Sequence, residues 1–141
     1  MARLRADKKN FKRAFKKHIH ACDNWHSGSD NSKRVIMCYC VECGLKYLIM
    51  EENKIYQVSQ AQEDIADILG SHDFRKLLKA VKKSGTYRFE VFQTEFGQTV
   101  TPENYHQVCR YCIGEKDKET VHMEKYDDTL RKITEWLKEV I

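Results

Sequence analysis

The amino-acid sequence predicts an α+β domain in which a zinc-stabilised β-hairpin is joined by a basic N-terminal helix, two short middle helices and a long C-terminal helix. Two observations lead to this prediction: the cysteines include two Cys-x-x-Cys pairs, and apolar residues recur at helical spacing at both ends of the chain. The 141 residues contain no internal repeat or linker. We therefore expect one domain over residues 1–141.

Residues 1–23 are predicted to form a basic amphipathic helix. An apolar stripe at helical spacing runs through Leu4, Phe11, Phe15, Ile19 and Cys22. The first 17 residues contain eight Lys and Arg residues and one Asp, a net charge of +7, whereas the whole chain carries only +4. The predicted helix is therefore strongly cationic, whereas the rest of the chain carries a small net negative charge. Its candidate binding residues are Arg5, Lys8, Lys9, Lys12, Arg13, Lys16 and Lys17.

A cationic helix face suits the phosphates of nucleic acid, because each neutralised phosphate releases bound counterions. We therefore expect nucleic acid or a nucleoprotein as the partner. A solvated surface helix, or a helix that meets an acidic protein or a membrane surface, would show the same charge pattern. Trp25, Tyr39 and Tyr47 could stack on unpaired bases, or they could belong to the core. No apolar run is long enough to cross a bilayer.

Residues 34–50 are predicted to be a β-hairpin whose turn is a zinc knuckle. The polar residues over 24–33 predict a loop before this hairpin. β-favouring residues flank the first cysteine pair, Cys40 and Cys43, on both sides. Gly44 directly after the pair supplies the permissive backbone that a knuckle needs.

Two short helices and a strand are predicted in the middle of the chain. Ser59 and Gln62 form a capping-box pattern for a helix that ends near Gly70. A second helix is expected over residues 73–83. The alternation of residue types over 86–94 predicts a strand.

The last third of the chain predicts a second knuckle and a long helix. Thr101 as N-cap and Pro102 at the first helical position indicate a helix start in segment 101–112, which delivers Cys109 and Cys112. Residues 121–141 are predicted to be an amphipathic helix that packs on the core or, alternatively, on a partner. Its stripe consists of Tyr126, Leu130, Ile133, Leu137 and Val140.

Four thiols in two such pairs predict a tetrahedral zinc site of Cys40, Cys43, Cys109 and Cys112. A site closed by four thiolates leaves no position for water, so the predicted zinc is structural. Other ligand sets remain open. Cys38 could replace Cys40, His106 could approach the metal, and a second set would use His18, His20, Cys22 and His26.

The use of cysteine also predicts a compartment. The chain opens without an apolar leader segment, and its six cysteines do not follow the pattern of a small secreted disulfide scaffold. We expect an intracellular protein, cytoplasmic or nucleoid-associated, in which clustered cysteines serve as ligands.

The two cysteine pairs resemble those of zinc-ribbon and treble-clef zinc fingers. In particular, residues 103–116, in which Asn104 precedes Cys109 and Cys112 and Lys116 follows, resemble the C-terminal half of an HNH-type treble clef. That resemblance implies a histidine general base on a strand and a magnesium-type cation on the scissile phosphate. The strand over 86–94 contains no histidine, and Asp73 of the nearby His72-Asp73 pair suits the start of a helix.

No Walker loop, dinucleotide fingerprint, His-Glu-x-x-His or nucleophile elbow occurs in the chain. The leading hypothesis is therefore a small zinc-stabilised binding protein that associates with nucleic acid or a nucleoprotein through its basic helix. One alternative is a regulator or inhibitor that docks on a larger nucleic-acid enzyme. The other is an HNH-like, metal-dependent nuclease.

Overall fold

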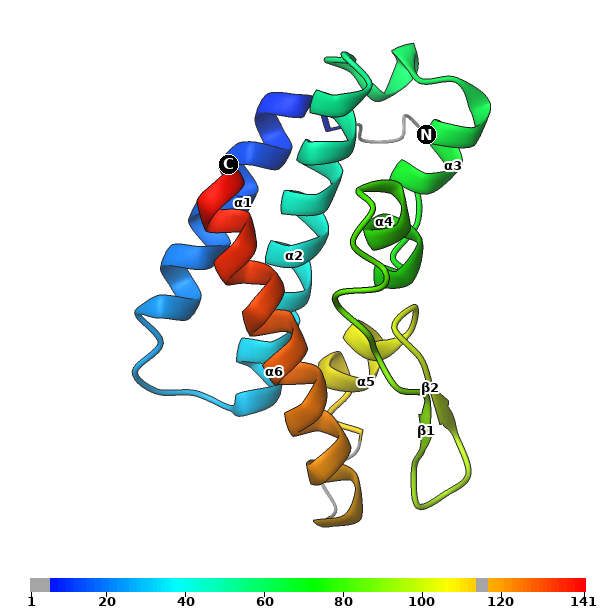
Figure 1. Ribbon diagram of the computed structural model, residues 1–141. Helices are drawn as coiled ribbons and strands as arrows, with labels where there is room; N and C mark the ends of the chain where they lie inside the picture. The colour runs from blue at the N-terminus through cyan, green and yellow to red at the C-terminus, as the bar shows by residue number, and fades with distance from the viewer. Residues whose placement is uncertain (1–5, 114–116) are drawn as a thin grey trace, which may run out of the picture.

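The computed structural model describes residues 6–113 and 117–141. Three long helices lie side by side in it (Figure 1): α1 (Lys8–Asp23), α2 (Asp30–Glu52) and α6 (Asp117–Val140). The short connection after α1 turns the chain back, so α2 runs antiparallel to α1. The final helix, α6, runs in the same direction as α2.

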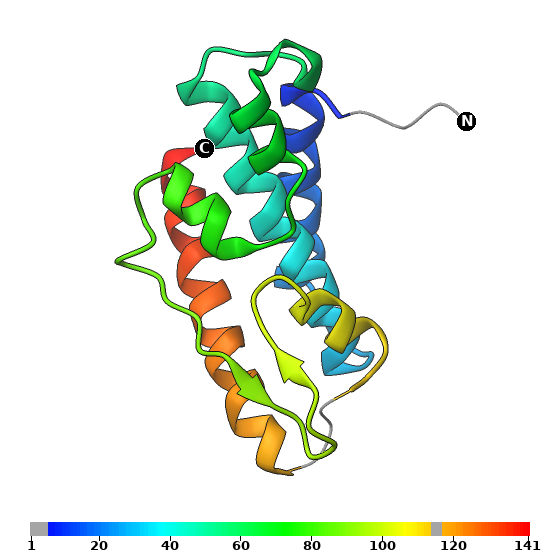
Figure 2. The same ribbon diagram turned by 90° about the vertical axis from the view of Figure 1, so that its right-hand side faces the viewer.

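The segment between α2 and α6 covers another side of α2 with short elements (Figure 2). Two of them are β-strands of two residues each, which pair antiparallel with Phe92 opposite Val100. The described elements of this segment are the 3₁₀ helix η1 (Val58–Gln60), α3 (Glu63–Leu69), α4 (Phe74–Ala80), β1 (Phe92–Gln93), β2 (Thr99–Val100) and α5 (Tyr105–Arg110).

The core is built around α2, which contacts α1, α4, α5 and α6. Val41, Leu45, Ile49 and Met50 are all 0% exposed, although they point to several sides of the helix. A helix that is apolar on all sides is a central helix. The other elements bury one face each against it.

Gly44 lies where α1 and α6 both pack closely against α2. A Cβ atom at this position would lie 2.7 Å from Cδ1 of Leu137 in α6 and 3.1 Å from Cδ2 of Phe15 in α1. Both distances are shorter than ordinary carbon contacts. The glycine therefore allows close helix packing, and it does not serve the turn of a knuckle.

The predicted zinc-ribbon or treble-clef-like core is wrong, because residues 34–50 are the interior of α2 and form no hairpin. The prediction failed because a helix that packs on several sides lacks the apolar–polar period of 3.6 residues. Without that period, the β-favouring residues on both sides of Cys40 and Cys43 indicated two paired strands. The predicted strand over 86–94 is also limited to the two residues of β1.

The expected helices at both ends and in the middle do form, with some different starts. Asp7 caps α1 by accepting a hydrogen bond from the Asn10 amide at 2.9 Å. Gly70 follows the end of α3 as expected, but α3 begins at Glu63 without the predicted Ser59 cap. Asp73 caps α4. The turn at residues 101–104 comes before α5, which begins at Tyr105.

Candidate functional site

The predicted cations of α1 divide into two groups. Lys9, Arg13, Lys16 and Lys17 are exposed and make no ion pair with any described residue. We call these four residues the α1 basic face. Arg5, the remaining predicted cation before α1, lies outside the described residues.

Lys8 and Lys12 are held against α2 instead. Lys8 forms an ion pair with Glu51, and its Nζ lies 5.0 Å from the ring centre of Tyr56. Nζ of Lys12 lies 5.5 Å from the ring centre of Tyr47. Cation–π and ionic contacts of this kind fix the two side chains on the protein. Their role is to attach α1 to α2, so among the described cations of α1 the four residues of the α1 basic face are the ones free for a partner.

The geometry of α1 explains why these four cations share one side. Phe15 is buried against Gly44 of α2, so the opposite side of α1 points to solvent. Residues 9, 13, 16 and 17 lie on that side because they are spaced by about one helical turn. The one acidic residue within α1, Asp23, forms an ion pair with Lys138 at 3.2 Å. The positive charge of the face is therefore not neutralised within the described chain.

The four predicted zinc ligands do not come together. Cys40 is buried on the α1 side of α2, where its thiol donates a hydrogen bond to the Phe15 carbonyl at 3.7 Å. Cys109 is buried in hydrogen-bond contact with Cys38, and Cys112 is exposed. Within residues 6–113 and 117–141, no group of three or more His, Cys, Asp or Glu side chains is placed to hold a metal ion.

The helical conformation of α2 separates these thiols. Cys38 and Cys40 would share one side of a strand, but on a helix they point about 200° apart. Because α5 packs on the Cys38 side, Cys109 cannot also reach Cys40. The described residues thus do not fit the predicted four-thiolate site. Zinc binding itself stays a prediction, which metal analysis of the purified protein tests.

The buried cysteines have the character of core residues. Burial raises the pKa of Cys22, Cys38 and Cys40, and burial followed by the charge of Glu42 raises the pKa of Cys43 to about 11. These thiols are therefore protonated at neutral pH and pack as small apolar side chains. The alternative set of His18, His20, Cys22 and His26 forms no metal-ligand group either, within the part of the chain described.

A cluster of ionisable side chains that the sequence did not predict lies between α2, the turn before α4, and α5. Oε1 of Glu42 lies 2.7 Å from Nδ1 of His72, and Oε2 of Glu42 lies 3.3 Å from Nζ of Lys46. The ring centres of His72 and His106 are 5.2 Å apart. We call Glu42, Lys46, His72 and His106 the histidine cluster.

The histidine cluster is partly open to solvent. The side chain of His72 is 54% exposed, whereas that of Lys46 is 6% exposed. Lys46 and His72 also line a cavity of about 630 Å³ beside apolar residues of α1, η1 and α3. Burial, and then the charges of His72 and Arg110, lower the pKa of His106. His106 is therefore mainly neutral at pH 7 and able to accept a proton.

The sequence contained only a weak signal for this cluster. The signal is the pair His72-Asp73, but Asp73 turns away to cap α4 by accepting a hydrogen bond from the Arg75 amide at 2.9 Å. Glu42 lies between the two cysteines of the predicted knuckle. No local spacing connects Glu42, His72 and His106, so only the tertiary fold brings them together.

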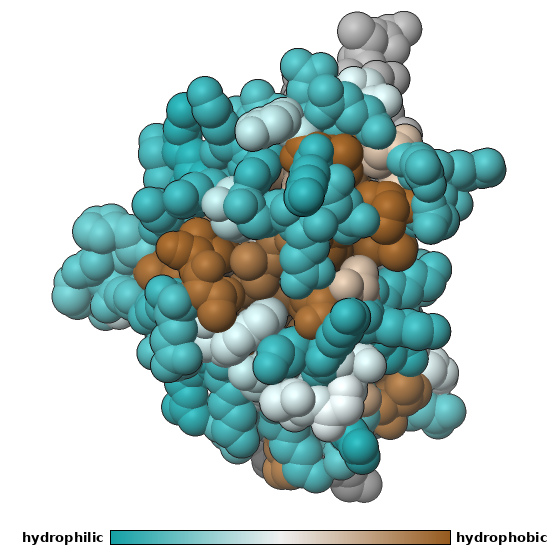
Figure 3. All heavy atoms as spheres, turned by 45° about the horizontal axis from the view of Figure 1, so that its top comes forward, coloured by the Kyte–Doolittle hydropathy of each residue, from teal (hydrophilic) through white to brown (hydrophobic). Residues whose placement is uncertain are grey.

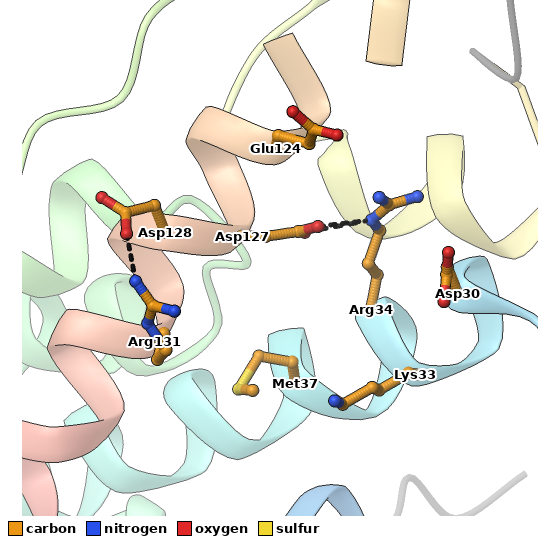
Figure 4. A pocket seen from close by; sticks show the side chains of 8 residues that line it. All are labelled: Asp30, Lys33, Arg34, Met37, Glu124, Asp127, Asp128 and Arg131. Atoms are coloured by element: carbon orange, nitrogen blue, oxygen red, sulfur yellow. Dashed lines mark hydrogen bonds and ion pairs between the residues drawn. The ribbon is translucent and has the colours of Figure 1, made fainter. Parts of the chain in front are cut away.

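A second cavity, of about 460 Å³, lies between the first turns of α2 and the middle of α6 (Figure 4). Arg34 and Asp127 point toward each other across it, and Nε of Arg34 donates to both carboxylate oxygens at 3.0 and 2.8 Å. The hydroxyl of Tyr105 in α5 donates to the same carboxylate at 3.1 Å. The carboxylate of Asp127 thus joins α2, α5 and α6, which makes this cavity a structural junction.

The end of the bundle where α1 begins and α2 ends has a mixed surface. Figure 3 shows apolar residues reaching the surface there between hydrophilic side chains. The segment over 55–65 and the C-terminus lie at this end (Figure 1), and both contribute half-buried apolar side chains, including Ile55, Val58, Ile65 and Ile141.

None of the helices in the described ranges is both long and apolar enough to span a membrane.

Comparison of the chain with protein families, curated proteins and solved structures found no match.

Proposed function

We propose that this protein binds nucleic acid through the α1 basic face. The observation that carries the proposal is that Lys9, Arg13, Lys16 and Lys17 are exposed together and make no ion pair with any described residue. Such a face attracts a polyanion because none of the described carboxylates forms an ion pair with its charges.

The chemistry of the face favours phosphates over bases. Three of the four residues are lysines, which act as flexible point charges and do not read base edges bidentately. Binding should therefore depend little on sequence and strongly on salt. The attachment of α1 to α2, through Phe15, Lys8 and Lys12, keeps the backbone positions of these four residues on one side of the molecule.

The direct test is the affinity for labelled single-stranded RNA, single-stranded DNA and duplex DNA over a range of salt concentrations. The test variant carries Lys9→Gln, Arg13→Gln, Lys16→Gln and Lys17→Gln, because glutamine keeps the helix propensity and removes only the charge. We expect weaker binding to all sequences, and a log–log salt slope reduced by about one unit for each cation that contacts a phosphate.

A matched control removes the same charge elsewhere. Arg88, Lys125, Arg131 and Lys132 lie outside α1, and the last three are in ion pairs with Glu90 or Asp128. Replacing these four residues with Gln gives the same net charge as the α1 variant. Equal losses of affinity in the two variants would show that only net charge matters and would refute the proposed face. A tight, nuclease-resistant complex with one protein would favour the regulator alternative.

Cleavage of RNA is a second candidate function, and the histidine cluster is the observation that favours it. In RNA, one imidazole can take the proton from a 2′-hydroxyl while the 2′-oxygen attacks the adjacent phosphorus. The other imidazole then protonates the departing 5′-oxygen, leaving a 2′,3′-cyclic phosphate. Glu42 holds Nδ1 of His72, and so leaves Nε2 of that ring for the reaction.

This chemistry differs from the HNH-like alternative because it needs a ribose 2′-hydroxyl and no metal. The test is cleavage of RNA and of the matching DNA in the presence of EDTA. We expect cleavage of RNA alone, and a loss of about 100-fold or more in rate for either His72→Gln or His106→Gln. His20→Gln, at an exposed position of α1, is the control. Cleavage of DNA, or activity that requires added Mg²⁺, would contradict this mechanism.

A further inference from the structure

We infer that α4 and the residues just after it carry a second nucleic-acid-binding face, so that one molecule bridges two nucleic-acid segments. This inference rests on the proposed function. Residues 74–83 contain five Lys and Arg residues and no acidic residue. Lys76, Lys79 and Lys82 are exposed and, within the described ranges, make no ion pair. We call these three residues the α4 basic face.

The other two cations of this segment are engaged within the protein. Arg75 forms an ion pair with the α4 cap Asp73 at 2.9 Å. Nζ of Lys83 lies 5.3 Å from the ring centre of Trp136 in α6. The segment therefore shows the same division as α1, in which some cations attach the element to the core and the rest point outward.

The two basic faces belong to helices on different sides of α2. Phe15 of α1 packs against Gly44 of α2, whereas α4 packs on α2 with Leu77 and Leu78 fully buried. Figures 1 and 2 show α1 and α4 separated by α2 in both views. Because each helix turns its apolar side toward α2, the cations of the two basic faces point away from α2. The two faces therefore look in different directions.

The α4 basic face does not extend over its neighbour α3. Glu63, Asp64 and Asp67 of α3 are exposed, and α3 contacts α4. These carboxylates interrupt the positive surface on that side, so the two basic faces do not merge across α3 into one continuous track. Two separate polyanion sites are the arrangement that this charge distribution favours. The α4 face has three free cations against four on α1, so it should bind a duplex more weakly and with a smaller salt slope than the α1 face does.

The test is energy transfer between two pools of the same short DNA duplex, one labelled with a donor and the other with an acceptor. We expect transfer at intermediate ratios of protein to duplex, and its loss when excess protein separates the duplexes. In the variant with Lys76→Gln, Lys79→Gln and Lys82→Gln, we expect the transfer to fall to background. Affinity for a single duplex should change less than threefold, because the α1 basic face is intact.

Two further variants keep the test decisive. Lys125→Gln, Arg131→Gln and Lys132→Gln remove the same charge from α6 and should leave the transfer intact. Lys76→Arg, Lys79→Arg and Lys82→Arg keep the charge and should retain bridging, and the retained affinity of the Gln variant for a single duplex excludes a folding defect as the cause of its loss.

The possible failures are distinguishable. If the wild-type protein binds a duplex but gives no transfer at any ratio, the bridging inference is wrong and nucleic-acid binding stands. Transfer that survives the Gln variant of α4 also overturns the inference, because bridging would then come from two copies that each use α1. If the wild-type protein binds no duplex and no single strand, the proposed function itself fails.

Discussion

The helices α1 and α2 pack against each other along most of their length, yet their residues have opposite uses. In α1 only Phe15 and Cys22 are buried, and most of its cations point to solvent. In α2 ten residues are buried, and they face α1, α4, α5 and α6. A helix with one buried side can change its outer surface without cost to the core, so function can develop on α1. A helix buried on most sides offers little surface, and in α2 that surface is limited to positions such as Glu42 and the first turns.

The largest difference between the helices should appear when α2 loses a core side chain. Leu45→Ala removes a fully buried side chain and should destabilise the protein by about 2–5 kcal/mol. Lys16→Ala on the exposed side of α1 should change stability by no more than about 0.5 kcal/mol. Urea unfolding followed by circular dichroism measures both. Similar effects at the two positions would show that α2 is not the central helix.

Gly44, where α2 contacts α1, should be the position at which substitution has the next largest effect on stability. Gly44→Ala places a methyl group against Leu137 and Phe15, so we expect a loss of about 1–3 kcal/mol from overpacking. In an exposed helix the same change would stabilise by up to about 1 kcal/mol. The sign of the change in unfolding free energy therefore decides whether the close approach is real.

Substitution of the Asp7 cap at the N-terminus of α1 should change the free energy of unfolding by a smaller amount. Asp7→Ala removes the side chain that accepts the Asn10 amide and should cost about 0.5–2 kcal/mol. Asp7→Asn keeps a capping oxygen and should cost much less. If the two variants unfold at the same urea concentration, packing on α2 stabilises this end of α1 and the Asp7 cap contributes nothing measurable to stability.

The smallest expected effect is a pH dependence of protein stability that comes from His18, at the boundary between α1 and α2. His18 of α1 is half-buried, with its ring centre 6.4 Å from that of Tyr39 in α2, and burial lowers its pKa. A histidine with a lowered pKa in the folded state contributes stability above its ordinary pKa, about 6.5, and this stability is lost as the pH falls through the lower value.

Unfolding free energies between pH 7 and pH 5 test this expectation. The wild-type protein should lose stability on acidification, and His18→Gln should reduce the loss. It should not abolish the loss, because the pKa of His106 is also lowered. His20→Gln, on the exposed side of α1, is the control. An unchanged pH dependence in His18→Gln would mean that this imidazole is not buried by α2.

Near the chain ends, local rules were enough to predict the structure. The apolar stripes of the two terminal helices have a clear helical period because each helix buries one side. Gly70 and Asp73 mark real helix boundaries, because a cap satisfies backbone groups within its own few residues. The cations of the α1 basic face could also be predicted from the sequence, since helical spacing alone places them opposite Phe15.

What the sequence by itself determined is thus the amphipathic helices and the concentration of positive charge on α1. Only the tertiary structure decided the rest, because the deciding contacts join residues distant in sequence. Residues 34–50 form a helix that packs against α1, α4, α5 and α6, and on this helix Cys38 and Cys40 point in nearly opposite directions and share no site. The same packing brought Glu42, His72 and His106 together and turned the cations of α4 away from those of α1.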